Sequence, residues 1–303
     1  MAFSAQDVKK LREMTSCGMM DCKKALTETD GDMDKAVEFL REKGLATAAK
    51  KAGRIASEGM VDAIVFDDGV AVAVEVNSET DFVAKNEEFK SFVRALATVI
   101  AKENPADVDA LKELKIDSSQ TVADALTEKI ATIGENMNIR RFARFDGVNT
   151  AYVHAGGKIG VLVNFNVADK SKADTDEFKT MARDVALQIT SMNPEYVCES
   201  EIPADRVQKE TDILKAQALN EGKPEAIVEK MVVGRIKKFF KEICLVDQVF
   251  VKDQDTTVGK YVESVAKSLG TEISIAKFAR LEKGEGLEKK EENFADEVAS
   301  MIK

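Results

Sequence analysis

The chain has 303 residues, enough for two or three domains that bury their own cores without disulfides or structural metals. Its 44 lysines and arginines stand against 54 aspartates and glutamates, and the resulting net charge of −10 argues against broad binding to nucleic-acid phosphates. No apolar run of about 18 residues occurs, which excludes a membrane-spanning helix. The four cysteines have no C-x-x-C spacing, and the start of the chain has no apolar leader, so we expect reduced thiols in a cytoplasmic protein.

The residue inventory excludes much familiar chemistry. His154 is the single histidine, so a multi-histidine metal site is impossible and nucleophilic catalysis could use only this residue. Neither a dinucleotide-binding glycine motif nor a phosphate-binding loop occurs, and Gly156-Gly157 is interpreted as a turn. Paired carboxylates remain an open alternative, but one sequence gives no geometry for choosing a pair. The composition therefore argues against an enzyme without excluding one, and we expect no metal site.

The first 54 residues predict a small three-helix module. Val8 and Leu11 follow a capping residue, Ser4, and a second helix is expected over about 19–29. The third helix is expected to end at Lys43-Gly44, because a cation followed by glycine is typical of a helix C-terminus. Residues 50–54 then connect the module to the rest of the chain.

The remainder of the chain contains an internal duplication. At an offset of 89 residues, residues 72–105 match residues 161–194, and both stretches end in Asn-Pro. Further along, the offset becomes 136, with residues 121–144 matching residues 257–280. The difference places an insertion of 47 residues in the second copy, between 194 and 257.

Each copy predicts the same α+β unit, a small antiparallel sheet backed by helices. Two strands form a hairpin, two helices follow, and one more strand completes the sheet. The expected strands are residues 61–65, 70–76 and 137–145 in the first copy and 150–154, 159–167 and 272–281 in the second; the leading helices are 87–102 and 175–192. The domains are therefore 1–54, 55–147, 148–286 with the insertion, and a C-terminal helix over 287–303.

The insertion, about residues 199–241, predicts a helical hairpin that projects like a coiled coil, because the repeated unit closes without it. The sequence leaves open whether this arm pairs two copies of the chain in a homodimer. Apolar residues recur along both arms and along the expected C-terminal helix: Val207, Ile213, Leu214 and Leu219; Ile227, Met231, Ile236 and Phe239; and Phe294, Val298 and Met301.

The two copies differ where the hairpin leads into the first core helix. Only the first copy, over residues 78–85, carries a large aromatic there, Phe82, whereas residues 168–173 of the second copy have none. Phe82 either folds back into its own core or forms part of a partner surface. A feature confined to one copy marks the place where the copies diverged in role.

A series of motifs occurs over residues 11–15, 18–26, 50–54, 75–77, 80–85 and 159–163, together with His154. In this order they resemble the bacterial translation elongation factor Ts family over essentially the whole chain. Ser78-Glu79 departs from that pattern, since family members often carry Cys-Gln at these positions.

The resemblance implies a guanine-nucleotide exchange factor for elongation factor Tu, with no chemistry or cofactor of its own. It implies a UBA-like N-terminal module that contacts the partner's nucleotide domain through Arg12, Met19 and Met20. It also implies that the segment Thr80, Asp81, Phe82 and Val83 enters that domain near the Mg²⁺ site, and that the second copy contacts another domain.

Alternative interpretations remain for several residues. The spacing of Met19 and Met20 alone favours a place in the core of the module, and the resemblance moves at least one of them outward. His154 is either a structural turn residue or a partner contact. Cys17 and Cys22 are interpreted as packing residues. A translation-associated RNA-binding protein is the alternative function, and it would use Lys50, Lys51, Arg54, Arg140, Arg141 and Arg144.

Overall fold

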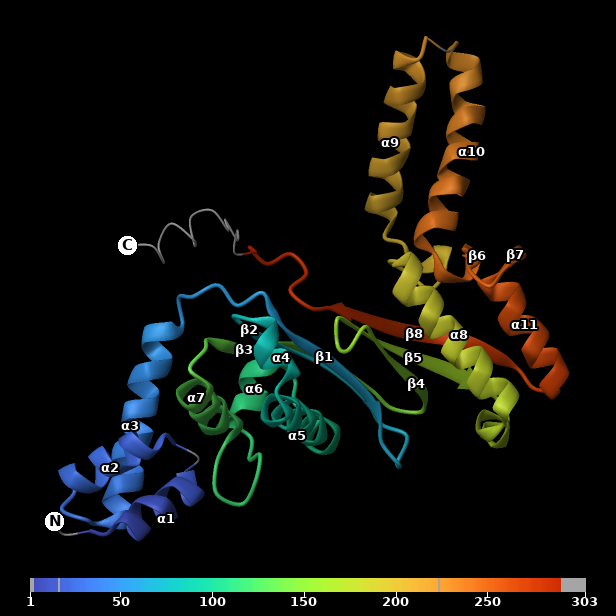
Figure 1. The fold of residues 1–303 in the computed structure, drawn as a ribbon. Coiled ribbons are helices and arrows are strands. Elements are labelled where there is room, and N and C mark those ends of the chain that lie inside the picture. Colours follow the sequence, from blue (N-terminus) through green and yellow to red (C-terminus); the bar gives the residue numbers. More distant parts are fainter. Residues whose placement is uncertain (1–2, 16, 223, 290–303) are drawn as a thin grey trace.

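The computed structural model describes residues 3–15, 17–222 and 224–289 (Figure 1). A helical module lies at one end, two small sheets with their helices form the centre, and a two-helix arm projects near the other end. Within these residues no helix combines the length and apolar character needed to cross a lipid bilayer.

The N-terminal module consists of α1 (Ala5–Thr15), α2 (Met19–Glu28) and α3 (Met33–Lys51). The apolar faces of the three helices meet in a small core that includes Leu11, Leu26 and Leu40. The Asp32 side chain caps α3 by accepting a hydrogen bond from the backbone N–H of Lys35. Three helices were predicted here, and their existence is confirmed.

The predicted end of the third helix at Gly44 is wrong, because α3 continues to Lys51. Gly44 is buried where α3 crosses α7 (Val122–Ile133), and a Cβ at position 44 would lie 3.6 Å from Ala131 Cβ. The glycine thus allows close packing of two helices and does not end one. Lys50 and Lys51 accordingly belong to α3, and the connection to the first sheet is shorter than predicted.

The first copy folds as a three-stranded antiparallel sheet in the order β1-β2-β3, as predicted. Its apolar outer face packs against four helices, and Phe89 and Leu96 are fully buried between the layers. The elements are β1 (Glu58–Val65), β2 (Ala71–Ser78), α4 (Asp81–Lys85), α5 (Glu87–Glu103), α6 (Val108–Glu113), α7 and β3 (Met137–Phe145).

The second copy repeats this plan with β4-β5-β8, packed against α8 and α11. The sequence missed a two-stranded sheet, β6-β7, which precedes α11. The elements are β4 (Val148–His154), β5 (Ile159–Val167), η1 (Lys170–Asp174), α8 (Asp176–Met192), η2 (Glu199–Glu201), η3 (Leu245–Asp247), β6 (Val249–Phe250), β7 (Asp253–Thr257), α11 (Val258–Leu269) and β8 (Ile273–Glu282).

Backbone details confirm the duplication. Both middle strands carry a register shift at equivalent places, between Glu75 and Val76 in β2 and between Asn164 and Phe165 in β5. Asn104 and Asn193 end α5 and α8 in the left-handed conformation, with φ of 47° and 45°. Asparagine tolerates this conformation better than most residues, which accounts for its repetition in the two Asn-Pro sequences.

The two sheets pack face to face, an arrangement that the sequence did not predict. Their inner faces carry mostly small side chains, including Ala71, Ala73, Ala151 and Ala279, around Leu162. Small residues let the backbones of the two sheets approach closely. Helices therefore cover only the two outer faces, and β2 and β5 are buried almost throughout.

A buried carboxylate joins the two copies at the inner face. Glu75 is fully buried and accepts hydrogen bonds from Arg141 Nε at 2.6 Å, Arg140 at 3.0 Å and the backbone N–H of Gly284 at 2.8 Å. Burial alone would raise the pKa of Glu75, but these bonds and one from Asn77 together lower it. The segment after β8 is thereby fastened to the first sheet.

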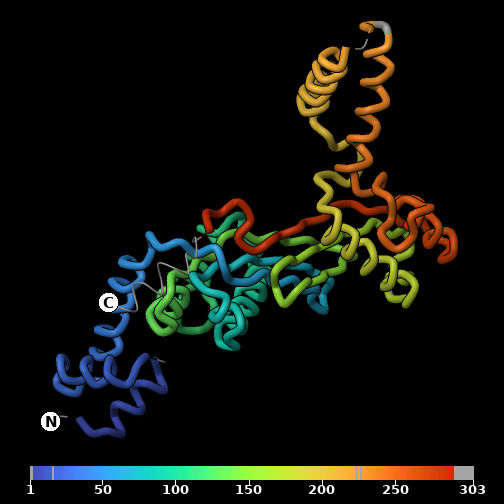
Figure 2. Tube along the Cα trace, turned by 45° about the horizontal axis from the view of Figure 1, so that its top comes forward, coloured from blue at the N-terminus to red at the C-terminus, as the bar shows by residue number. Residues whose placement is uncertain are grey.

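The insertion forms the predicted helical hairpin, α9 (Ala204–Asn220) and α10 (Glu225–Ile243), which stands away from the sheets (Figure 2). Ala218, Val228 and Val232 are buried between its arms. Ile213, Leu219 and Ile227, which belonged to the predicted apolar pattern, are exposed instead. Small and β-branched side chains therefore fill the narrow seam. The helix predicted over 287–303 falls, from residue 290 onward, outside the described residues.

Candidate functional site

The segment that distinguishes the first copy forms the short helix α4, directly after β2. Phe82 is 78% exposed, the largest exposed fraction among the exposed large apolar side chains of the described residues. Its neighbour Val83 is 7% exposed and belongs to the core cluster beneath the helix. Since successive helix residues point about 100° apart, one turn suffices to present the ring outward and anchor the helix inward.

This geometry assigns different positions to the four residues Thr80, Asp81, Phe82 and Val83. Asp81 and Phe82 are exposed, Thr80 is half-buried, and Val83 lies in the core. The proposed partner contact through Val83 stays a prediction, and in this structure its side chain packs against the chain's own core. The interpretation of Phe82 as a core residue is excluded by its exposure.

Lys85 organises the exposed face of α4. Its Nζ atom lies 2.6 Å from Asp81 Oδ2 and 5.6 Å from the centroid of the Phe82 ring. The hydrogen bond from Lys85 lowers the pKa of Asp81 below its ordinary 3.8. The helix thus presents an aromatic ring beside a charged pair, a combination suited to contact with a partner.

The turn between α7 and β3 holds the entrance to α4. Glu135 accepts two hydrogen bonds from Thr80, at 3.0 Å from its backbone N–H and 2.6 Å from its hydroxyl. The backbone N–H of Asn136 donates to Glu79 at 2.6 Å. Sequence reasoning missed Glu135 and Asn136, because they lie more than 50 positions away and carry no motif of their own.

The corresponding segment of the second copy has a different surface. It forms the 3₁₀ turn η1, in which no residue is buried and no aromatic occurs. Asp169 accepts hydrogen bonds there from the backbone N–H and hydroxyl of Ser171, a self-contained cap. Of the two equivalent connections, only that of the first copy combines an anchored helix with an exposed ring.

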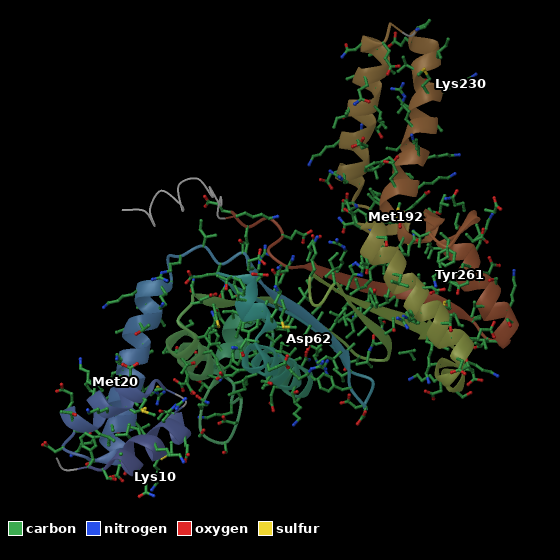
Figure 3. The ribbon with its side chains drawn as sticks, viewed as in Figure 1. Lys10, Met20, Asp62, Met192, Lys230 and Tyr261 are labelled. Carbon is green, nitrogen blue, oxygen red and sulfur yellow. The ribbon has the colours of Figure 1, made fainter. Side chains whose placement is uncertain are left out.

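Arg12 lies on α1, and Met19 and Met20 lie on α2. Figure 3 shows Met20 in this module, at the end of the molecule away from the sheets. All three are exposed, Met19 by 54% and Met20 by 73%, so the core interpretation of both methionines is wrong. Cys22 is buried in the module and Cys17 is half-buried, and desolvation raises the pKa of both thiols. Cys22 packs as predicted.

His154 ends β4, before the turn that leads into β5. Its ring is exposed, and its Nδ1 atom lies 3.1 Å from the Tyr152 hydroxyl. The backbone carbonyl of His154 accepts hydrogen bonds from the N–H groups of Gly157 and Lys158. The residue therefore combines a structural turn, in its backbone, with an accessible side chain.

The basic residues proposed for RNA binding are largely engaged within the chain. Arg140 and Arg141 bind the buried Glu75, Arg54 pairs with Glu79 at 3.4 Å, and Lys51 donates to the Gly134 carbonyl. Arg144 pairs with Asp146 at 2.7 Å. Such paired side chains build the fold, and they do not form the free basic surface that phosphate binding requires.

Known proteins match this chain over nearly its whole length. The family model described as Elongation factor TS matches residues 79–285, from the entrance of α4 to the segment after β8. The chain belongs to the elongation factor Ts family. Elongation factor Ts of Clostridium novyi (strain NT) is 55% identical over 301 residues, covering 97% of both chains. Those of Clostridium perfringens (strain 13 / Type A) and Clostridium acetobutylicum are each 53% identical, covering 99% of this chain and 99% and 98% of theirs.

The coverage of the elongation factor Ts relatives extends beyond the family model. It includes the N-terminal module with Arg12, Met19 and Met20, so membership applies to nearly the whole length of the chain.

Proposed function

We propose that this elongation factor Ts accelerates GDP release from elongation factor Tu by inserting Phe82 of α4 into the partner's nucleotide domain, near its Mg²⁺ site. The exchange role follows from family membership and requires no covalent chemistry. The observation that carries the mechanism is the exposure of Phe82, 78%, on a helix whose next residue is anchored in the core. An aromatic ring held in water by a fixed backbone loses little conformational entropy when it is buried in a partner.

The thermodynamics of exchange define what this surface has to do. A factor that speeds GDP release must bind the nucleotide-free partner more tightly than the loaded partner, and by linkage GDP must weaken the complex by the same factor. Burial of Phe82 favours a rearranged pocket. The negative charge of Asp81 disturbs the environment of Mg²⁺, or accepts hydrogen bonds from displaced backbone.

The exposed residues elsewhere provide further contacts. We assign Arg12, Met19 and Met20 to a second contact on the partner's nucleotide domain, because flexible thioethers adapt to an apolar surface. His154 extends the contact from the second copy. In this proposal the module is the UBA-like domain of the family, the hairpin adds an auxiliary coiled-coil contact, and the protein acts in the cytoplasm.

The test is stopped-flow measurement of GDP release from purified elongation factor Tu, with Phe82→Ala compared with the natural chain. If Phe82 is a hot spot worth about 2–4 kcal/mol, stimulated release falls roughly ten-fold or more. The thermal midpoint should stay nearly constant, because Phe82 is exposed. Unchanged release by the folded variant would contradict the mechanism.

Two control variants separate contact from folding. Ser171→Ala alters the counterpart turn of the second copy and should leave GDP release unchanged. Val83→Ala removes two buried methyl groups beneath α4 and should lower the free energy of unfolding by about 2 kcal/mol. A drop in release for Val83→Ala without any loss of stability would place Val83 at the partner surface and not in the core.

A further inference from the structure

The helix that presents Phe82 is too short to be stable on its own. α4 has five residues, whereas isolated helices shorter than about 12 residues are marginal in water. Its orientation therefore depends on what holds its two ends. Val83 fastens the middle of the helix to the core, and its carbonyl accepts a hydrogen bond at 2.9 Å from the backbone N–H of Asn86 at the exit. The entrance is the end that remains to be fixed.

The entrance to α4 is held by a charged contact from outside the helix. Thr80 occupies the N-cap position, but its hydroxyl makes no hydrogen bond within α4. It donates to Glu135 Oε1 at 2.6 Å, while its backbone N–H donates to Glu135 Oε2 at 3.0 Å. Hydrogen bonds to a carboxylate are about twice as strong as neutral ones, and two of them fix direction as well as distance.

Neighbouring contacts hold the backbone next to Glu135. Asn136 is 9% exposed, and its backbone N–H donates to Glu79 while its side chain donates to the Arg54 carbonyl at 2.7 Å. Ser78 in turn donates its hydroxyl to the Thr80 carbonyl at 2.9 Å. The segment that carries Glu135 and the segment that carries Thr80 are thus each held by hydrogen bonds of neighbouring residues.

The second copy contains the counterpart of this contact in a weaker form. Offsets of 89 and 136 residues relate Thr80 to Asp169 and Glu135 to Thr271. There the backbone N–H of Asp169 donates to the Thr271 hydroxyl at 3.0 Å, a single neutral bond. A hydrogen bond at this place is therefore common to both copies. Only the copy with the exposed ring has two hydrogen bonds to a charged carboxylate there.

We propose that Glu135 is a positioning residue for nucleotide exchange, which sets through Thr80 the direction in which α4 presents Phe82. This inference rests on the proposed role of Phe82. It predicts that loss of the Glu135 carboxylate slows the exchange step itself, and that Glu135 matters only while the aromatic ring is present.

The experiment measures stimulated GDP release from elongation factor Tu at increasing concentrations of the full-length chain. This yields a maximal rate and a half-saturating concentration. For Glu135→Ala we expect the maximal rate to fall about five- to ten-fold, because the ring is no longer held in the productive direction. The half-saturating concentration should stay within about two-fold, because the other contact surfaces are intact. Glu135→Gln keeps one acceptor oxygen and should lose less.

Three comparisons distinguish positioning from a general structural role. Thr271→Ala removes the equivalent tie of the second copy and should leave the maximal rate unchanged. In the Phe82→Ala background, Glu135→Ala should cause no further loss. If Glu135→Ala fails to fold, Thr80→Val, which removes only the hydroxyl bond, should show a smaller fall in maximal rate at an unchanged thermal midpoint.

The outcomes that would overturn the proposal are distinct from those that concern Phe82. A maximal rate for folded Glu135→Ala within two-fold of the natural chain would refute it, as would an equal loss for Thr271→Ala. A further loss in the Phe82→Ala background would assign Glu135 to a different role. If Phe82→Ala alone left stimulated GDP release unchanged, the proposed role of Phe82 itself would be refuted.

Discussion

Gly160 of β5 lies against Val61 of β1 so closely that a Cβ at position 160 would be 2.4 Å from Val61 Cγ1. Both residues lie on the inner faces, where the two sheets meet. The spacing between the sheets therefore depends on the absence of a side chain at one position, and the duplicated halves pack as one unit for this reason.

We expect Gly160→Ala to lower the free energy of unfolding by about 1–3 kcal/mol, because the added methyl group forces the sheets apart. Urea unfolding measures the change. Combining it with Val61→Ala, which removes the opposing Cγ1, should recover part of the loss. Gly234→Ala in α10 is the control and should not lower the stability, since a Cβ there meets no atom of a neighbouring element within 4 Å and alanine favours a helix over glycine. Equal stability of Gly160→Ala and the natural chain would contradict the packing.

Glu75 should make stability depend on acid pH. Its pKa is lowered from an ordinary 4.5, so the stability it contributes is complete above about that pH and is lost as the pH falls towards the folded-state pKa. At pH 7, Glu75→Gln should lose about 3 kcal/mol, since Arg140 and Arg141 lose their buried partner. Urea unfolding between pH 7 and pH 3.5 should show this difference shrinking below about 4.5, whereas a constant difference would exclude Glu75 as its source.

Gly44 should tolerate one methyl group and no more. A Cβ there would make ordinary contacts, 3.6 Å from Ala131 and 3.8 Å from Thr127, and alanine favours the helix over glycine by about 1 kcal/mol. We expect Gly44→Ala to raise the thermal midpoint slightly and Gly44→Leu to lower it, because leucine would push α3 away from α7. Similar midpoints for the two variants would mean that the helices do not pack closely in solution.

Met19 and Met20 should contribute to affinity without contributing to folding. The double variant to alanine should weaken binding to nucleotide-free elongation factor Tu roughly ten-fold, a loss of about 1.4 kcal/mol, and keep its thermal midpoint. Isothermal titration calorimetry gives the affinity. Met192→Ala provides a matched control, because this methionine of α8 is 49% exposed but lies outside the proposed contact. An equal loss for the control would indicate a non-specific effect.

The arm should be removable if its base is kept. Ile202, Ile243 and Cys244 pack with Val207, Phe239 and Phe240 beneath the hairpin, so replacing residues 209–237 by a short flexible linker spares this cluster. Calorimetry should still show one cooperative transition, and GDP release should fall only modestly. Loss of cooperativity would show that the arm belongs to the core. Replacing residues 199–241, the whole predicted insertion, should be more damaging because it removes Ile202 and Phe239.

The sequence predicted those parts of the fold that repeat. The offsets of 89 and 136 residues located both sheets, because the same apolar alternation and the same terminal asparagines occur twice. The packing of the sheets on one another was not predictable. The alternation of small residues such as Ala71 and Ala73 indicates a buried face, but it does not say which element covers that face. Gly44 misled the prediction because helix ends and close helix crossings both favour glycine, and only the three-dimensional contact decides between them.

The candidate site was predictable only in part. The difference between the copies singled out Phe82 but left open whether its ring lies in the core or at the surface. Val83 carries an apolar side chain that suits a core and a partner equally well. Glu135 could have been found only by asking which residue occupies the counterpart position of Thr271. Its role depends on a contact over 55 residues, and the hydrophobic pattern of the chain does not encode such contacts.

Because α3 continues through Gly44, it fixes the distance between the N-terminal module and the first sheet. A helix of 19 residues is about 28 Å long, and its packing on α7 prevents it from bending at the glycine. The methionines beyond one end and the aromatic ring on the sheet side are consequently held at a set separation. A GTPase with a suitable pocket but a different distance between its two docking surfaces could bind the methionines or the aromatic ring, but not both at once. The fixed separation would thereby discriminate against such a GTPase.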